Sequence, residues 1–194
     1  MESSAKHIFL IRHQRPDLPK KGWFGQQQAS KFLRDYDTVN IEALVNKPPG
    51  LPFEQITRVY CSGLPRARQT ARAIFGPDIE LIEDPDFNEF QRRIFEFPLL
   101  RLPLKFWLLS ARALWLLGLN HQGIETFKQA RVRARRCAER LAREAEKENK
   151  VVLVAHGFLN AFIRRALKQM GWRVVRHDGA GFLGVTELIK AATP

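Results

Sequence analysis

The chain has 194 residues, of which 45% are hydrophobic and 27% are charged, a composition that fits one soluble globular domain, or one domain with an insertion. Its two cysteines, Cys61 and Cys137, exclude a disulfide framework and favour a reducing cytoplasm, and the polar start (1–6) carries no signal-peptide core. The net charge of +12 favours anionic partners, such as phosphorylated metabolites, nucleic acid or an acidic membrane surface, without choosing between them.

The first apolar run, residues 8–11, is short and rich in β-forming residues, which predicts a strand buried on both faces. It stops at Arg12-His13, and Pro16 prevents the ladder from continuing. The elements expected next are a loop over 14–28, a short helix around 32–36 and a connection over 46–53.

Residues 56–61 predict a second strand, which leads into a helix with Ser62 as a candidate N-cap and Pro65 in the first turn. The helix carries an apolar stripe at helical spacing and ends at Gly76. A short third strand follows at 79–82.

Residues 92–120 form an unusual segment, dense in leucine and tryptophan but interrupted by charges. Pro103 and Gly118 bracket a helix on which Lys105 and Arg112 share a face, and no uncharged stretch approaches the ~18 residues of a membrane span. We interpret the segment as an inserted helical cap whose Trp107, Trp115, Phe106 and leucines form the cap core. The alternative is an interfacial helix that binds anionic lipid.

A long helix is expected from 127 to 145, and its many arginines predict a solvated face rather than a nucleic-acid site, because no aromatic residues are interleaved to stack bases. A buried strand at 151–155 then ends at His156-Gly157, and a helix at 159–170 and a strand at 183–189 complete the chain. Strands that alternate with helices predict an α/β fold with a mostly parallel sheet.

Three strand ends therefore deliver polar residues to one sheet edge, where open α/β sheets hold their ligands. Arg12 and Arg66 offer planar forks that match phosphate oxygens, and the starts of two helices favour an anion. His13 and His156 beside these two cations make a poor metal site, so we expect a phosphate group and neither a metal nor a cofactor. A neutral imidazole can attack phosphorus and hold the phosphoryl group as phosphohistidine. The proton that the leaving oxygen needs would come from a carboxyl group, and the candidates are Glu83, Asp84, Asp86 and Glu89.

Three stretches resemble the signatures of one family. They are Ile-Arg-His at 11–13, Ser-Gly-Leu-Pro-Arg-Ala-Arg-Gln-Thr-Ala at 62–71 and Val-Ala-His-Gly at 154–157. In order and spacing they are similar to the histidine phosphatase (phosphoglycerate mutase-like) superfamily, over nearly the whole chain. The resemblance implies a three-layer α/β/α sandwich in which 92–120 is the substrate-shaping cap.

Carried over by position, the resemblance implies that His13 is the phosphorylated nucleophile and that Arg12 and Arg66 bind the phosphoryl group. His156 would contact this group from the other side, and Glu89, with Glu83 as the weaker candidate, would be the acid. The family usually reads Arg-His-Gly-x-Thr-x-x-Asn, whereas here Gln14, Pro16 and Pro19 stand at the last three of its fixed positions, and Gln14 or Arg15 are candidates to compensate.

The expected function is therefore a metal-independent phosphatase, of the histidine acid phosphatase type, acting on a small phosphorylated metabolite through a phosphohistidine intermediate. Phosphoglycerate mutase-like phosphotransfer and a catalytically weak phosphate-binding module are the alternatives. We expect a small phosphorylated substrate as the partner and no nucleic acid, and we favour a covered cap over a membrane-bound helix. The sequence does not predict the substrate or the oligomeric state.

Overall fold

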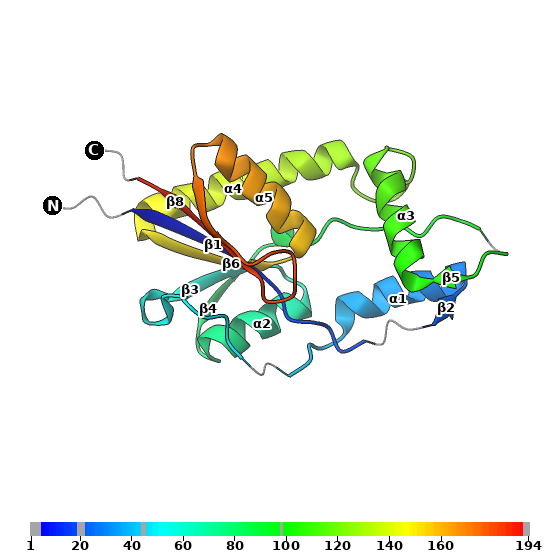
Figure 1. Ribbon diagram of the computed structural model, residues 1–194, viewed down its shortest axis with the longest axis horizontal. Coiled ribbons are helices and arrows are strands. Elements are labelled where there is room, and N and C mark those ends of the chain that lie inside the picture. The colour runs from blue at the N-terminus through cyan, green and yellow to red at the C-terminus, as the bar shows by residue number, and fades with distance from the viewer. Residues whose placement is uncertain (1–4, 19–21, 44–45, 98, 192–194) are drawn as a thin grey trace.

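The computed structural model describes residues 5–18, 22–43, 46–97 and 99–191. A six-stranded sheet in the order β4-β3-β6-β1-β8-β7 forms its centre (Figure 1). The strands are β1 (Lys6–Arg12), β3 (Arg58–Cys61), β4 (Glu80–Glu83), β6 (Lys150–Ala155), β7 (Arg173–His177) and β8 (Val185–Lys190). β4, β3, β6 and β1 pair in parallel, whereas β8 runs antiparallel to β1, and β7 antiparallel to β8.

Helices cover both faces of this sheet, as expected of three layers. Alternate residues of β1 explain the arrangement: Ile8 and Leu10 pack with α4 (Phe127–Glu148) and α5 (Gly157–Gln169), while Phe9 and Ile11 pack with α2 (Pro65–Phe75). The prediction that β1 and β6 are buried on both faces is therefore confirmed, and so is the mostly parallel α/β fold.

A smaller group of elements lies at the end of the molecule opposite the termini (Figure 1). Here α1 (Gln26–Thr38) and α3 (Leu104–Leu116) share a core built around Phe32, Leu104 and Trp107, beside the short pair β2 (Trp23–Phe24) and β5 (Leu102–Pro103). The helix expected around 32–36 is therefore the C-terminal part of a longer one. The interpretation of 92–120 as an inserted cap stays a prediction.

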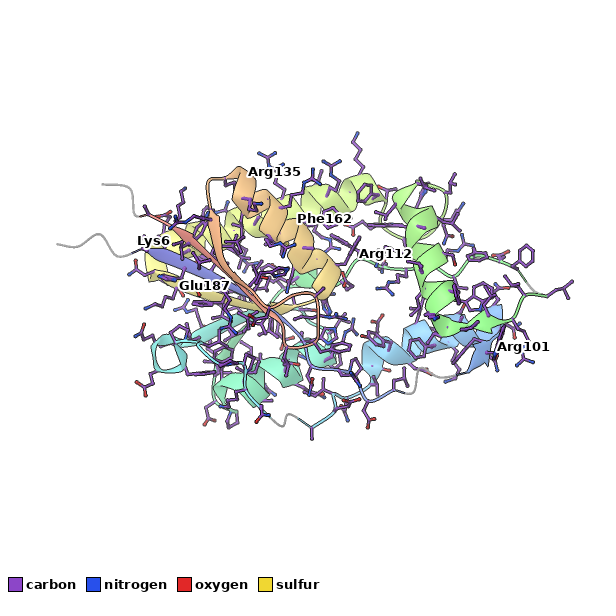
Figure 2. The ribbon with its side chains drawn as sticks, viewed as in Figure 1. Lys6, Arg101, Arg112, Arg135, Phe162 and Glu187 are labelled. Carbon is purple, nitrogen blue, oxygen red and sulfur yellow. The ribbon has the colours of Figure 1, made fainter. Side chains whose placement is uncertain are left out.

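Two expectations about the segment 92–120 are wrong in detail. Trp107 and Trp115 are buried, but Phe106 and several leucines are exposed, because α3 carries apolar residues on more than one side and only one side meets α1 and the main body. Lys105 and Arg112 also differ: Lys105 is exposed, whereas the Arg112 side chain reaches inward to backbone carbonyl groups (Figure 2). Among the described residues, no helix is long and apolar enough to cross a membrane.

The antiparallel edge strand β7 is missing from the sequence-based prediction, because its two valines stand between basic residues and do not form the longer apolar run that identified β1 and β6. The short 3-10 turns Phe53–Gln55 and Pro85–Phe87 complete the described elements.

Candidate active site

The C-terminal end of β1 delivers His13 to the sheet edge. His13 is buried, and its Nδ1 lies 2.6 Å from the carbonyl oxygen of Gln14. A carbonyl oxygen only accepts hydrogen bonds, so Nδ1 carries the proton and the lone pair of the neutral ring is on Nε2. The backbone therefore sets the tautomer that a nucleophilic histidine needs.

The neighbouring parallel strand β6 places His156 against His13, with the two ring centroids 5.0 Å apart. His156 Nε2 lies 2.8 Å from Ser62 Oγ, and that hydroxyl donates to Asn88 Oδ1 at 2.7 Å. Nε2 therefore donates to Ser62. Burial, together with the positive charges of Arg66 and Arg12, holds the pKa of His156 well below 6.5, so its ring is neutral at pH 7. The prediction of Ser62 as the N-cap of α2 is wrong, because the N-cap is Leu64, and Ser62 instead orients the His156 ring.

Arg12 lies between the start of α5 and the loop before β8. Its guanidinium is 4.2 Å above the Phe182 ring and donates to the carbonyl oxygen of Ala180. A Cβ atom on Gly157 would lie 3.2 Å from both Cδ and Nε of Arg12, so the glycine after His156 makes room for this side chain. Burial lowers the pKa of Arg12 from its usual value.

Arg66, in the first turn of α2, is buried and points to the same site. Its Nη1 donates to the carbonyl oxygen of Tyr36 at 2.8 Å and to Asp37 Oδ1 at 3.0 Å, and its guanidinium lies 4.7 Å from the Tyr36 ring. Its Nε is buried and makes no hydrogen bond with the described residues. The end of α1 thus holds Arg66 by one side of the guanidinium fork.

Glu89 is the acidic candidate that the structure brings to this site. Its Oε1 accepts from the N–H groups of Leu159 at 3.1 Å and Phe90 at 3.0 Å, and its Oε2 accepts from the N–H of Phe158 at 3.2 Å. The carboxyl group therefore sits at the positive end of α5, where backbone donors are unpaired. It is neither a solvated loop residue nor buried in apolar packing.

The other three acidic candidates lie elsewhere. Glu83 is exposed and pairs with Arg68, whereas Asp84 pairs with Arg140 and Asp86 with Arg136. None of the three lines the cavity described next. The structure thus selects Glu89 from the predicted set by position.

A cavity of about 370 Å³ opens at these side chains. All five predicted residues line it: Arg12, His13, Arg66, Glu89 and His156. Several other lining residues were not predicted from the sequence: Arg34, Tyr36, Asp37, Asn88 and Arg92. Of these five, only Asn88 and Arg92 could have been found from the sequence, since both lie within three residues of Glu89. The residues of α1 could not, because helical periodicity does not reveal which strand end a helix approaches.

Arg112 also supports the site without lining the cavity. It is buried on α3, and it donates to the carbonyl oxygen of Phe90 at 2.8 Å, directly after Glu89. Its guanidinium lies 4.8 Å from the Trp115 ring and 4.7 Å from the Phe158 ring. Burial and the nearby charge of Arg92 lower its pKa. Arg112 thereby connects α3 to the segment that carries Glu89.

The structure describes most of the residues at 14–19 where the sequence departs from the family pattern. Gln14 points its amide to the carbonyl oxygen of Ala43, and Arg15 lies near Glu42 and Phe182, so neither lines the cavity. The proposal that Gln14 or Arg15 compensates by contacting the anion has no support in this geometry. Pro16 forms a bridge with Ile41, and Pro19 lies outside the described residues.

The arrangement combines two arginines, a histidine with a lone pair on Nε2, a second histidine and a carboxyl group around one cavity, a set that suits a tetrahedral oxyanion. Within the ranges that the structure describes, no three His, Cys, Asp or Glu side chains gather as metal ligands would.

Comparisons with solved structures identify the fold. A structure titled mycobacterial hydrolase 2 matches with a TM-score of 0.56 and 21% identity, covering 98% of this chain and 84% of the other. A mycobacterial glucosyl-3-phosphoglycerate phosphatase in complex with VO3 matches with a TM-score of 0.53 and 19% identity, covering 96% and 97%. The ecdysone phosphate phosphatase of Bombyx mori, in complex with tungstate, matches with a TM-score of 0.52 and 15% identity, covering 97% and 92%.

A search of curated proteins gave no significant match. The family model of the histidine phosphatase superfamily (branch 1), however, matches residues 8–188, which include all three sequence signatures and every residue of the cavity. This chain belongs to the histidine phosphatase superfamily.

Proposed function

We propose that the protein is a metal-independent phosphatase that hydrolyses a small phosphorylated metabolite through a phosphohistidine on His13. The observation that carries the proposal is the tautomer of His13. Its Nδ1–H is held by the Gln14 carbonyl oxygen, which puts the lone pair of the neutral ring on Nε2, in a cavity that Arg12 and Arg66 also line.

In the first step, His13 Nε2 forms a bond to phosphorus while the ester P–O bond breaks. Negative charge on the equatorial oxygens is stabilised by the guanidinium groups of Arg12 and Arg66. Nε of Arg66 is buried without a partner in the described structure, so a donor is available for a bound anion. His156 lies on the other side of His13, and because its one N–H is donated to Ser62, a contact with the anion would require its ring to take up a second proton.

Glu89 supplies the proton that the leaving oxygen requires. Its Oε2 accepts only the N–H of Phe158 among the described residues, so this oxygen keeps a lone pair that can carry the proton. In the second step a water molecule attacks phosphorus, the P–N bond breaks, and the Glu89 carboxylate takes the proton from the water. The enzyme returns to its starting state, and the products are an alcohol and inorganic phosphate.

The cavity supports a small substrate with both polar and apolar parts. Leu33, Leu108 and Ile124 line it beside Arg92, which makes no hydrogen bond or ion pair with the described residues. A volume of about 370 Å³ lies near the lower end of the range for small-molecule sites. Two buried free cysteines, Cys61 and Cys137, favour a cytoplasmic location for such an enzyme.

One alternative has specific support. Arg12, Arg66 and Glu89 all have partners within the protein, namely the Ala180 carbonyl oxygen, the end of α1 and the start of α5. A chain that keeps these contacts with an anion bound would be a phosphate-binding module with little turnover.

The test is hydrolysis of p-nitrophenyl phosphate with and without chelator, together with trapping of the phosphoenzyme under alkaline denaturing conditions, which preserve phosphohistidine. We expect chelator-insensitive turnover, inhibition by orthovanadate and a labelled protein. H13A should lose turnover and label together, whereas H177A, at an exposed histidine on β7, should retain both. Tight orthovanadate binding without turnover would instead support the binding module. Transfer of the label to a second position of a sugar or glycerate ester would indicate a mutase.

A further inference from the structure

The side of α3 that faces away from the protein is an apolar surface. Phe106 is 48% exposed, Leu109 68% and Leu116 38%, and the turn after the helix adds Leu117 at 72% and Leu119 at 65%. We call these five residues the outer α3 face. Residues 106, 109 and 116 lie three and seven positions apart, so they form one stripe along the helix.

This stripe is not needed for the core that α3 shares with the rest of the protein. The opposite side of the helix buries Leu104, Trp107 and Trp115. A surface helix of a soluble protein normally has polar residues on its outer side, and clustered exposed apolar residues mark an interaction site. The outer α3 face therefore needs an explanation other than packing.

More exposed apolar residues lie beyond the start of the helix. Trp23, which is 64% exposed, pairs with Pro103 across the β2–β5 ladder, one residue before α3 begins. Leu99 is also exposed, and Arg101 lies at the far end of the molecule from the termini (Figure 2). Lys105 Nζ lies 5.1 Å from the Phe106 ring, so a cation borders the stripe directly.

The charge of this region indicates which kind of partner the outer α3 face binds. Residues 92–120 contain five arginines and lysines but one acidic residue, Glu96, and the whole chain carries a net charge of +12. A second copy of the chain would bring these cations together, which disfavours self-association through this face. A bilayer with anionic headgroups matches both properties, since it accepts leucine, phenylalanine and tryptophan at the acyl boundary and attracts lysine and arginine.

We propose that the outer α3 face, bordered by Trp23, Arg101 and Lys105, binds the surface of an anionic lipid bilayer with α3 lying in the interface. The sequence alone favours a covered helix on which Arg112 and Lys105 share a face. The structure changes that view, because Arg112 is buried and the leucines are exposed. The proposal does not depend on the phosphatase activity, since the catalytic cavity is lined by Leu108 and not by the outer α3 face.

The test is cosedimentation of the full chain with vesicles of phosphatidylcholine alone or mixed with phosphatidylglycerol. We expect binding to the mixed vesicles and a loss of roughly tenfold in partition for L109Q and again for L117Q, since each removes one inserted leucine. V175Q is the matched control, because Val175 is 48% exposed on β7, and it should bind as the wild type does. K105Q should weaken binding roughly fivefold, and K168Q, at an exposed lysine on α5, should weaken it less.

Two further measurements separate the outcomes. The other three tryptophans are buried, so iodide quenching reports on Trp23, and mixed vesicles should protect it. Orthovanadate at an inhibitory concentration should leave vesicle binding unchanged; competition would mean that the catalytic cavity holds the headgroups and would overturn the proposal. Absence of binding, an equal effect of L109Q and V175Q, or a dimer in sedimentation that L109Q dissociates would overturn it too. All variants should retain p-nitrophenyl phosphate turnover if the wild type has it.

Discussion

The close approach of Gly157 to Arg12 makes a sharp prediction for G157A. The added Cβ would lie 3.2 Å from Cδ and Nε of Arg12, where an ordinary contact is 3.4–4 Å, so the side chain must shift by a few tenths of an ångström. Arg12 cannot swing away without cost, because it donates to the Ala180 carbonyl oxygen and lies over Phe182.

The magnitude follows from two effects of opposite sign. Gly157 is the first residue of α5 and has no left-handed backbone, so alanine there should leave the free energy of unfolding unchanged or raise it by up to ~1 kcal/mol. A misplacement of about 1 Å can cost about 100-fold in rate. A shift of a few tenths of an ångström should therefore lower kcat/KM about tenfold, or ~1.4 kcal/mol of transition-state stabilisation.

The assay compares kcat/KM for p-nitrophenyl phosphate, inhibition by orthovanadate and the Tm of G157A with those of G181A. Gly181 has no neighbour within 4 Å of a built Cβ, so G181A controls for the loss of a glycine. Weaker orthovanadate inhibition and lower kcat/KM at an unchanged or higher Tm is the expected result. Wild-type kinetics in G157A would refute the reasoning, because Arg12 would then not bind the phosphoryl group from the position described.

Four further predictions follow from other contacts. E89Q should slow alkyl phosphates more than aryl phosphates, since alkoxide leaving groups need the proton; equal slowing would remove Glu89 as the acid. T70V should lower the Tm and kcat/KM, because the Gln14 N–H loses its acceptor at a cost of about 1–3 kcal/mol, whereas Q14G should change kcat/KM little. R112M should lower kcat/KM by releasing the Phe90 carbonyl oxygen beside Glu89, and a Tm loss with unchanged kinetics would make Arg112 structural only. The pKa of His156 is depressed in the folded state, so below pH 6.5 the unfolded chain binds more protons than the folded chain does. The free energy of unfolding should therefore fall as the pH drops through that value. H156Q should make the free energy of unfolding, measured by chemical denaturation, depend less steeply on pH.

Much of the site could be predicted because the ends of buried strands can be recognised in the sequence. An unbroken apolar run marks a strand buried on both faces, and the carboxyl ends of parallel neighbours meet at one edge. β1 and β6 pair in register from His7–Lys150 to Arg12–Ala155, so the residues that follow them, His13 and His156, lie side by side.

The remaining features depend on tertiary contacts that no local pattern reports. The approach of Tyr36 and Asp37 to Arg66 is set by how α1 packs, and the inward turn of Arg112 is set by two aromatic rings from α3 and α5. The density of leucine in 92–120 predicted burial, yet several of these leucines are exposed. Composition alone does not distinguish a helix that is covered on every side from a helix with one exposed side.

The geometry also explains why the family pattern at 12–19 can change without removing the nucleophile. Residue 14 acts through its backbone: its carbonyl oxygen sets the His13 tautomer, and its N–H donates to Thr70 Oγ1. Its φ angle is not in the left-handed region, so glycine is not required there. Thr70 in turn donates to the carbonyl oxygen of Arg66, and Gln69 holds the N–H of Ile41 in the segment after α1. The Gln-Thr pair of the second signature therefore couples the nucleophile, the arginine and the end of α1 through the main chain, and a side-chain substitution at 14 leaves that coupling intact.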